Sequence, residues 1–133
     1  VFHNPADPAQ KNTCNGIFVY TSTVGSAVSW GETEVSFVID DNDWWIWLGS
    51  LTLANDVVLK FRPGSYLVLQ NAGSLINYNG SGVAFTSYKD DSRKGDTNGD
   101  GGVTTPGNGD WGGIYNDDTS TYQTWGSIYY DSH

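Results

Sequence analysis

Short runs in which apolar and polar residues alternate fill most of this 133-residue chain, and none of them has the spacing of a helix. No stretch of ten or more residues carries apolar side chains at every third and fourth position, so we predict an all-β protein. The predicted strands are rich in β-branched and aromatic residues and are bounded by Gly, Asn, Asp or Pro turns. They cover residues 16–20, 27–30, 34–39, 44–48, 51–53, 57–61, 66–69, 75–78, 83–86, 113–115 and 127–130.

A regular spacing marks the middle of the chain. Leu59, Leu67, Leu75 and Val83 are eight residues apart, and each lies in an alternating patch. Brief turns such as RPGS and QNAGS join these patches, which is typical of a chain that coils into a solenoid. Three strands with their turns make a rung of about two dozen residues, which suits a short right-handed parallel β-helix of triangular cross-section. An antiparallel β-sandwich or jelly roll gives the same alternation and remains the alternative.

The segment DWWIWL places three tryptophans on one predicted strand. If Trp44, Ile46 and Leu48 face the core, the other two tryptophans face outward. Trp45 and Trp47 then stand about 7 Å apart, a spacing that suits stacking on sugar units or on a partner surface. Because an apolar run on both parities usually has cover on both sides, we favour burial of this strand inside the monomer or by a neighbouring subunit.

The stretch GDTNGDGGVTTPGNGDWGGI is acidic and rich in glycine. Within it, Asp96, Asn98 and Asp100 with the glycine that follows reproduce D-x-N-x-D-G, the first half of a calcium loop. Alternate ligands suit such a loop because a tight turn brings every second side chain toward one point. We therefore predict that Ca²⁺ binds here, with a solvated acidic turn as the alternative.

Three side chains do not complete a calcium shell, which takes about six to eight oxygens. The loop is not an EF-hand, because no predicted helices flank it and Gly107 stands where the final Glu would be. The remaining ligands must then come from nearby carboxylates and a backbone carbonyl, for which the candidates are Asp90, Asp91, Asp110 and Gly102.

Acidic residues outnumber basic ones by 15 to 6, which gives a formal net charge of -9. This charge repels phosphate backbones and anionic bilayers, so we predict no nucleic acid partner. No signal-like segment and no apolar run near about 18 residues occurs, so we predict a mature chain without membrane insertion. Abundant Gly, Asn, Ser, Thr, Trp and Tyr indicate an extracellular or cell-surface protein, and the single Cys14 excludes an internal disulfide.

Candidates for catalysis are few. His3 and His133 lie near the ends of the chain, and no G-x-S-x-G or H-E-x-x-H motif occurs. We therefore predict that the protein is not an enzyme. Five basic residues could serve as a catalytic base, but surface solubility explains them better: Lys60, Arg62, Lys89, Arg93 and Lys94.

Asn79, Gly80 and Ser81 form an N-glycosylation sequon in a predicted turn. Most such triplets carry no sugar in bacterial proteins. Asn79 is nevertheless the candidate attachment site if the protein is a glycoprotein.

The stretch VAFTSYKDDSRKGDTNGDGGVTTPGNGDWGGI resembles a signature of bacterial right-handed parallel β-helix surface proteins. In that signature a strand ending in F-T-S leads into a G-D-x-N-G-D-G loop, and the chain returns at D-W-G-G-I. The preceding LTLANDVVLKFRPGSYLVLQNAGSLI resembles the rung pattern of the same family, so the likeness covers residues 51–114. It implies a parallel β-helix fold and a secreted or surface location.

The two ends of the chain suggest how the protein works. Residues 1–12 contain two prolines and have no strand partner among themselves, so we predict an extended arm that docks on a neighbouring subunit. A short solenoid also has open strand edges and exposed apolar rungs at both ends, which other copies can cover. A head-to-tail contact that does not close into a ring produces a filament.

These observations predict a single all-β domain over residues 1–133, with extended N-terminal strands, a β-helix-like part at 51–133 and a calcium-type loop at 90–110. The expected function is a calcium-stabilised structural subunit of a surface fibre, which assembles by strand exchange or solenoid stacking. The first alternative is a carbohydrate-binding or cell-adhesion module that uses Trp45 and Trp47. The second is a fragment of a β-helix polysaccharide lyase, because some β-helix proteins have that activity.

Overall fold

The computed structural model describes residues 16–20, 23–40, 42–95, 97, 99 and 103–133. Strands and turns make up this described part of the chain, and it contains no helix. Among these residues, accordingly, no helical segment has the length and apolarity needed to cross a bilayer. The predicted all-β class is confirmed.

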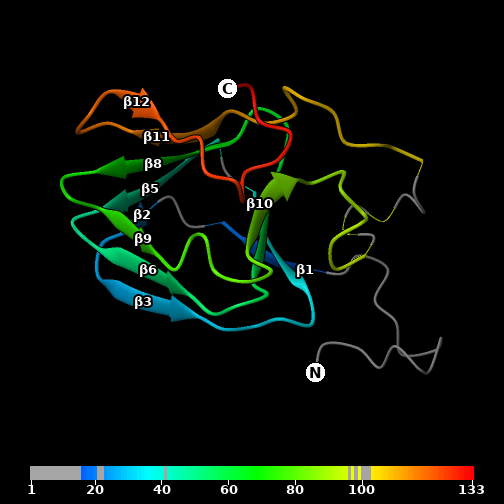
Figure 1. Cartoon of the computed structure of the whole chain (residues 1–133), viewed down its shortest axis with the longest axis horizontal. Coiled ribbons are helices and arrows are strands. Elements are labelled where there is room, and N and C mark those ends of the chain that lie inside the picture. The colour runs from blue at the N-terminus through cyan, green and yellow to red at the C-terminus, as the bar shows by residue number, and fades with distance from the viewer. Residues whose placement is uncertain (1–15, 21–22, 41, 96, 98, 100–102) are drawn as a thin grey trace.

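Three sheets, which we name A, B and C, form the sides of the molecule (Figure 1). Sheet A consists of β1 (Gly16–Val19), β4 (Ser36–Ile39), β7 (Val58–Phe61) and β10 (Ala84–Ser87). Sheet B consists of β2 (Thr23–Val24), β5 (Asp43–Trp47), β8 (Tyr66–Gln70), β11 (Gly113–Asn116) and β12 (Thr121–Tyr122). Sheet C consists of β3 (Ala27–Trp30), β6 (Ser50–Leu53) and β9 (Ser74–Ile76).

The chain visits sheets A, B and C in turn, so each set of three consecutive strands from β1 to β9 is one rung of a solenoid. Every strand pair is parallel except β11 with β12. Phe37 pairs with Leu59, 22 residues later, and Ala27 pairs with Ser50, 23 residues later. The predicted parallel solenoid with rungs of about two dozen residues is confirmed, and the antiparallel sandwich is excluded.

The predicted start of the solenoid at residue 51 is wrong. Parallel pairing begins at Gly16, because β1 pairs with β4 and β3 pairs with β6. The first two rungs escaped prediction because their connections differ in length. Ile17 pairs with Phe37 after 20 residues, whereas Phe37 pairs with Leu59 after 22, so apolar residues do not recur there at a constant interval.

Inward-facing side chains from all three sheets fill the interior. The aromatic rings form stacks inside it: Trp30 lies 4.3 Å from Phe37 and 5.3 Å from Trp44, measured between ring centroids. Farther along the axis, Phe61 stacks on Trp111 at 4.1 Å. The fully buried members of this core include Ile39, Trp44, Ile46, Leu51, Leu59, Phe61, Leu67, Phe85, Trp111 and Ile114.

One predicted core residue faces outward. Leu48 is 63% exposed and has a φ of 59°, because β5 ends at Trp47 and the chain turns toward β6. The alternation of β5 therefore holds for Trp44 and Ile46 but stops one residue before Leu48.

The C-terminal segment closes the far end of sheets A and B. Ile128 forms an isolated parallel β-bridge with Phe85 of β10, and Asp131 forms another with Trp111. Trp125 stacks on Tyr78, with 3.8 Å between ring centroids, so residues 125–130 form part of one last incomplete coil. Sheet C has no such addition among the described residues and ends at β9.

Candidate functional site

The segment after β10 lies on the outer face of sheet A. Lys60, in the middle of β7, is fully buried, and its Nζ donates to the Gly95 carbonyl at 2.9 Å and to Thr97 Oγ1 at 2.6 Å. Thr97 Oγ1 also lies 3.2 Å from Ser36 Oγ on β4. The expectation that Lys60 serves surface solubility is wrong, because this residue holds the acidic segment against the sheet.

Asp90 is the most buried of the described carboxylates in this segment. It accepts hydrogen bonds from Thr86 Oγ1 at 2.7 Å and from the Ser92 backbone and hydroxyl, and Arg93 forms an ion pair with it at 3.0 Å. Burial opposes ionisation, but the Ser92 and Thr86 hydrogen bonds and the Arg93 charge outweigh it and lower the pKa of Asp90. Both oxygens of this carboxylate are therefore occupied by protein donors.

Asp110 closes the other end of the segment. Its carboxylate accepts from Ser87 Oγ at 2.6 Å and from the Gly107 N–H at 3.1 Å, and Lys89 Nζ lies 3.4 Å away. Burial again opposes ionisation, but the bonds from Ser87 and Gly107 and the Lys89 charge lower the pKa of Asp110. Asp90 and Asp110 thus fasten the two ends of the segment to β10 and its neighbours.

The calcium ligands predicted from D-x-N-x-D-G, together with Gly102, lie outside the described residues: Asp96, Asn98, Asp100 and Gly102. Within the described part of the chain, no three His, Cys, Asp or Glu side chains are grouped so that they could hold a metal ion. Asp91 lies half-buried next to Asp90 on the same segment. The calcium site therefore stays a prediction, and Asp90 and Asp110 could join it only by sharing oxygens that already accept hydrogen bonds.

Removal of calcium tests this prediction. If Ca²⁺ binds only the folded chain, EGTA is expected to lower the melting temperature by several degrees, because a ligand stabilises the state that binds it. Addition of excess CaCl₂ should restore the original melt, whereas MgCl₂ should not. A melting curve that EGTA leaves unchanged would contradict the calcium prediction.

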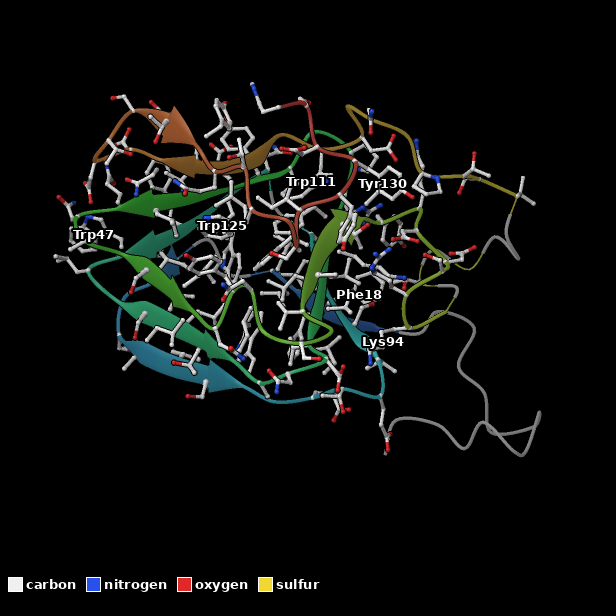
Figure 2. The ribbon with its side chains drawn as sticks, in the orientation of Figure 1. Phe18, Trp47, Lys94, Trp111, Trp125 and Tyr130 are labelled. Carbon is white, nitrogen blue, oxygen red and sulfur yellow. The ribbon has the colours of Figure 1, made fainter. Side chains whose placement is uncertain are left out.

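The outer face of sheet B presents aromatic side chains. Trp44 and Ile46 are fully buried, whereas Trp45 is half-buried and Trp47 is 43% exposed, so these four residues alternate between core and outer face. Both outward tryptophans line a shallow hollow of about 370 Å³, together with Thr23 and Gln70. Figure 2 shows Trp47 at the opposite side of the molecule from Lys94. The described part of this chain does not cover the outer side of β5, so burial inside the monomer is not observed.

Tyrosines on the neighbouring strands extend this aromatic face. Trp45 pairs with Val68, Val68 with Tyr115, and Tyr115 with Tyr122, so these side chains form one row across β5, β8, β11 and β12. Tyr66 lies on the same face of β8, two residues before Val68. These tyrosines are not among the outward-facing residues predicted from the sequence. The alternation within the predicted strands 66–69 and 113–115 was the available signal for Tyr66 and Tyr115.

A short hairpin holds the last tyrosine of this row in place. Asp118, in the turn between β11 and β12, accepts from the Asn71 N–H at 2.9 Å and from the Ala72 N–H at 2.7 Å. Asn71 and Ala72 both have positive φ, a conformation that lets successive N–H groups converge on one anionic group. The β11–β12 hairpin is thereby attached to the β8–β9 turn.

The two ends of the solenoid differ from its middle. In the first rung, all the residues packed on the core except the buried Val24 are only partly buried, whereas their counterparts in the second rung are buried. These partly buried residues are Ile17, Val19, Val28 and Trp30. No described strand pairs with the outer edges of β1, β2 and β3, or with the outer edge of β9.

Asn79 is exposed in the turn that follows β9. With Arg93, Ser127 and Tyr129 it lines a hollow of about 350 Å³, and the Arg93 guanidinium lies 4.0 Å from the centre of the Tyr129 ring. An exposed turn is accessible to glycosylation, and modification of Asn79 stays a prediction.

Comparison with protein-family models, with curated proteins and with solved structures finds no match for this chain. The resemblance of residues 51–114 to bacterial β-helix surface proteins therefore stays a prediction as to family. Function has to be argued from the three features above: the covered acidic segment, the aromatic face and the open ends.

Proposed function

We propose that this chain is a structural subunit of an extracellular or cell-surface fibre, in which copies stack head to tail along the solenoid axis. The observation that carries the proposal is the open first rung. Ile17, Val28 and Trp30 face the core there but are only partly buried. A second copy placed against this end would remove their remaining apolar surface from water, which favours association.

The opposite end offers a matching surface. Tyr78 and Trp125 stack there, both only partly buried, next to the outer edge of β9, with which no described strand pairs. The outer edges of β3 and β9 pair with no described strand, so β3 of one copy can pair with β9 of the next and sheet C then continues from subunit to subunit. Because the two joined surfaces are different, such a contact repeats without closing and gives a filament.

Strand exchange by residues 1–12 is the other form of this assembly that we expect from the sequence. The arm lies outside the described residues. No described strand pairs with the outer edges of β1 and β3, and an arm from a neighbouring copy could add a strand there. Calcium binding would stabilise the segment that covers sheet A, not the subunit contact itself.

An engineered disulfide tests the stacked arrangement. Ala27 and Ser74 belong to one row of sheet C, with Ser50 between them. Within one copy they are two strand spacings apart, about 9.6 Å, which is too far for a disulfide. Continuation of sheet C into the next copy would place Ala27 beside Ser74 of that copy, at one strand spacing.

We therefore expect the variant with Ala27→Cys and Ser74→Cys, in a Cys14→Ser background, to form a ladder of covalent oligomers on mild oxidation. Non-reducing electrophoresis measures the ladder. The matched control pairs Ala27→Cys with Thr119→Cys, which lies in the exposed β11–β12 turn, and should give no ladder. If both pairs stay monomeric, or if both form the same ladder, the stacking proposal is wrong.

The lyase alternative gains no support from the basic residues near the acidic segment. Lys60 is bound to Gly95 and Thr97, and Arg93 forms an ion pair with Asp90. Lys89 lies against Asp110. A catalytic base must reach its substrate proton, and these three side chains already serve the attachment of the segment to sheet A.

A further inference from the structure

The outer face of sheet B carries a row of aromatic side chains that the proposed assembly does not use. Trp45, Tyr115 and Tyr122 lie in one register across the sheet, with Val68 between the first two. Val68 is only 3% exposed although it is on the outer face, so neighbouring side chains cover it. The row therefore presents rings to solvent along the solenoid axis, perpendicular to the strands.

The spacing of these rings is set by the backbone. Trp45 and Tyr115 are separated by β8 alone, so their Cα atoms stand two strand spacings apart, or about 9.6 Å, and outward-facing side chains keep about this separation. The disaccharide repeat of an extended β-1,4-linked glycan has about this length. Alternate sugar rings of such a chain turn the same face to one side. Two aromatic rings at this separation can each stack on one sugar of successive repeats.

The rings are held before any ligand arrives. Trp44 and Ile46 fix β5 from the core side, and Asp118 fixes the β11–β12 hairpin. Tyr115 and Tyr122 lie 4.9 Å apart between ring centroids. Binding to such a face requires little ordering of side chains, which lowers its entropic cost.

Polar groups border the row and suit hydroxyl-rich ligands. Gln70 and Thr23 line the hollow beside Trp45 and Trp47, and the Gln70 amide donates to Asp117 at 2.6 Å. The Tyr66 hydroxyl bonds to Asp43, and this bond together with the carboxylate charge raises the pKa of Tyr66. Carboxylate, amide and hydroxyl groups at the rim of an aromatic platform can orient sugar hydroxyls.

The negative charge around this face restricts which glycans can bind there. The carboxylates of Asp43, Asp117 and Asp118 lie on or beside this face, and the whole chain has a net charge of -9. Polymers of uronic acids and sulfated glycans would be repelled. Neutral sugars combine the apolar ring face that stacks on aromatics with hydroxyls for the polar rim.

We propose that the outer face of sheet B binds a neutral, extended, β-1,4-linked glycan, which crosses the strands from Trp45 toward Tyr122. The site uses none of the core-facing residues of the end surfaces, although Thr23 on β2 and Tyr122 on β12 lie on the outermost strands of sheet B. If copies do stack along the axis, the row repeats in every subunit and the fibre binds one long glycan at many points, which increases avidity.

The test is a titration of the full chain with soluble hexasaccharides, followed by tryptophan fluorescence and by calorimetry. Cellohexaose or chitohexaose is expected to bind saturably, whereas oligogalacturonate and the α-linked maltohexaose are not. Trp45→Ala and Tyr115→Ala should each weaken binding several-fold to about tenfold, as loss of one stacking contact does. The control is Tyr20→Ala, which removes an exposed ring outside the row and should leave the affinity unchanged.

Melting curves of each variant show whether the fold is retained. Trp47→Ala tests a second, more exposed tryptophan that lines the same hollow. Unchanged affinity in folded Trp45→Ala and Trp47→Ala would overturn the proposal. Absence of binding to both neutral β-1,4 hexasaccharides would overturn it as well, as would equal or tighter binding of the acidic or α-linked oligomers. None of these outcomes depends on whether the disulfide ladder forms.

Discussion

Trp111→Ala is expected to lower the free energy of unfolding by about 3–5 kcal/mol, as replacement of a buried tryptophan by alanine usually does. The side chain is fully buried and stacks on Phe61, with 4.1 Å between ring centroids. Its indole N–H donates to the Tyr129 carbonyl at 2.8 Å, which ties the C-terminal segment to the core. The mutation would leave both a cavity and an unsatisfied carbonyl.

Urea denaturation monitored by circular dichroism measures this effect. The matched control is Trp47→Ala, which removes the same side chain from an exposed position and should change stability by less than about 1 kcal/mol. Figure 2 shows the contrast, with Trp111 inside the molecule and Trp47 at its edge. Equal losses in the two variants would contradict the placement of Trp111 in the core.

Gly73→Ala is the second variant with a large expected effect. A Cβ at this position would lie 1.9 Å from the Ile46 carbonyl oxygen and 2.6 Å from its carbon. These are backbone atoms of the preceding rung, so no side-chain rotation relieves the overlap. Overpacking usually costs about 1–3 kcal/mol, and a clash with backbone places this variant at or above the upper end of that range.

The position matters because two rungs meet there. The Gly73 N–H donates to the Gln70 carbonyl at 2.9 Å, and the next residue, Ser74, donates to the Gly49 carbonyl at 3.1 Å. The control is Gly107→Ala, whose added Cβ would meet no atom within 4 Å. We expect a low soluble yield or a strongly reduced melting temperature for Gly73→Ala and a near-native melt for Gly107→Ala. Two similar melts would show that the rungs do not approach as closely as described.

The middle of the fold could be predicted because local pattern and global structure agree there. Leu59, Leu67 and Leu75 repeat every eight residues and lie inward on β7, β8 and β9. The first two rungs carry the same kind of inward residues, but their turns vary in length, so no constant interval marks them. Periodicity in sequence detects a solenoid only where successive turns are equally long.

The aromatic face could be predicted in part. Alternation within one strand identified Trp45 and Trp47 as outward-facing. The rest of the row depends on pairing between distant segments: Tyr66 pairs with Gly113, 47 residues later, because the segment over sheet A intervenes. No local pattern fixes the register across such an insertion, so the alignment of Tyr115 and Tyr122 with Trp45 could not be predicted.

The way in which the acidic segment covers sheet A could not be predicted from the sequence. Its composition predicted an ion-binding loop, and the basic residue Lys60 was assigned to the solvent. Lys60 instead lies under that segment and donates to Gly95 and Thr97. A sheet that is covered on both faces has to satisfy the outward polar groups of its strands, and the segment over sheet A does this for Ser36, Lys60 and Thr86. Such cover depends on tertiary packing, which strand alternation does not encode.

Electron microscopy of the purified full chain tests the central claim of head-to-tail assembly most directly. We predict unbranched filaments about as wide as one solenoid, with subunits repeating along the solenoid axis. Ala27→Cys with Ser74→Cys should lock the same filaments after oxidation, so that they survive dilution. Dispersed single particles at every protein concentration, with sedimentation at the monomer mass, would contradict the claim.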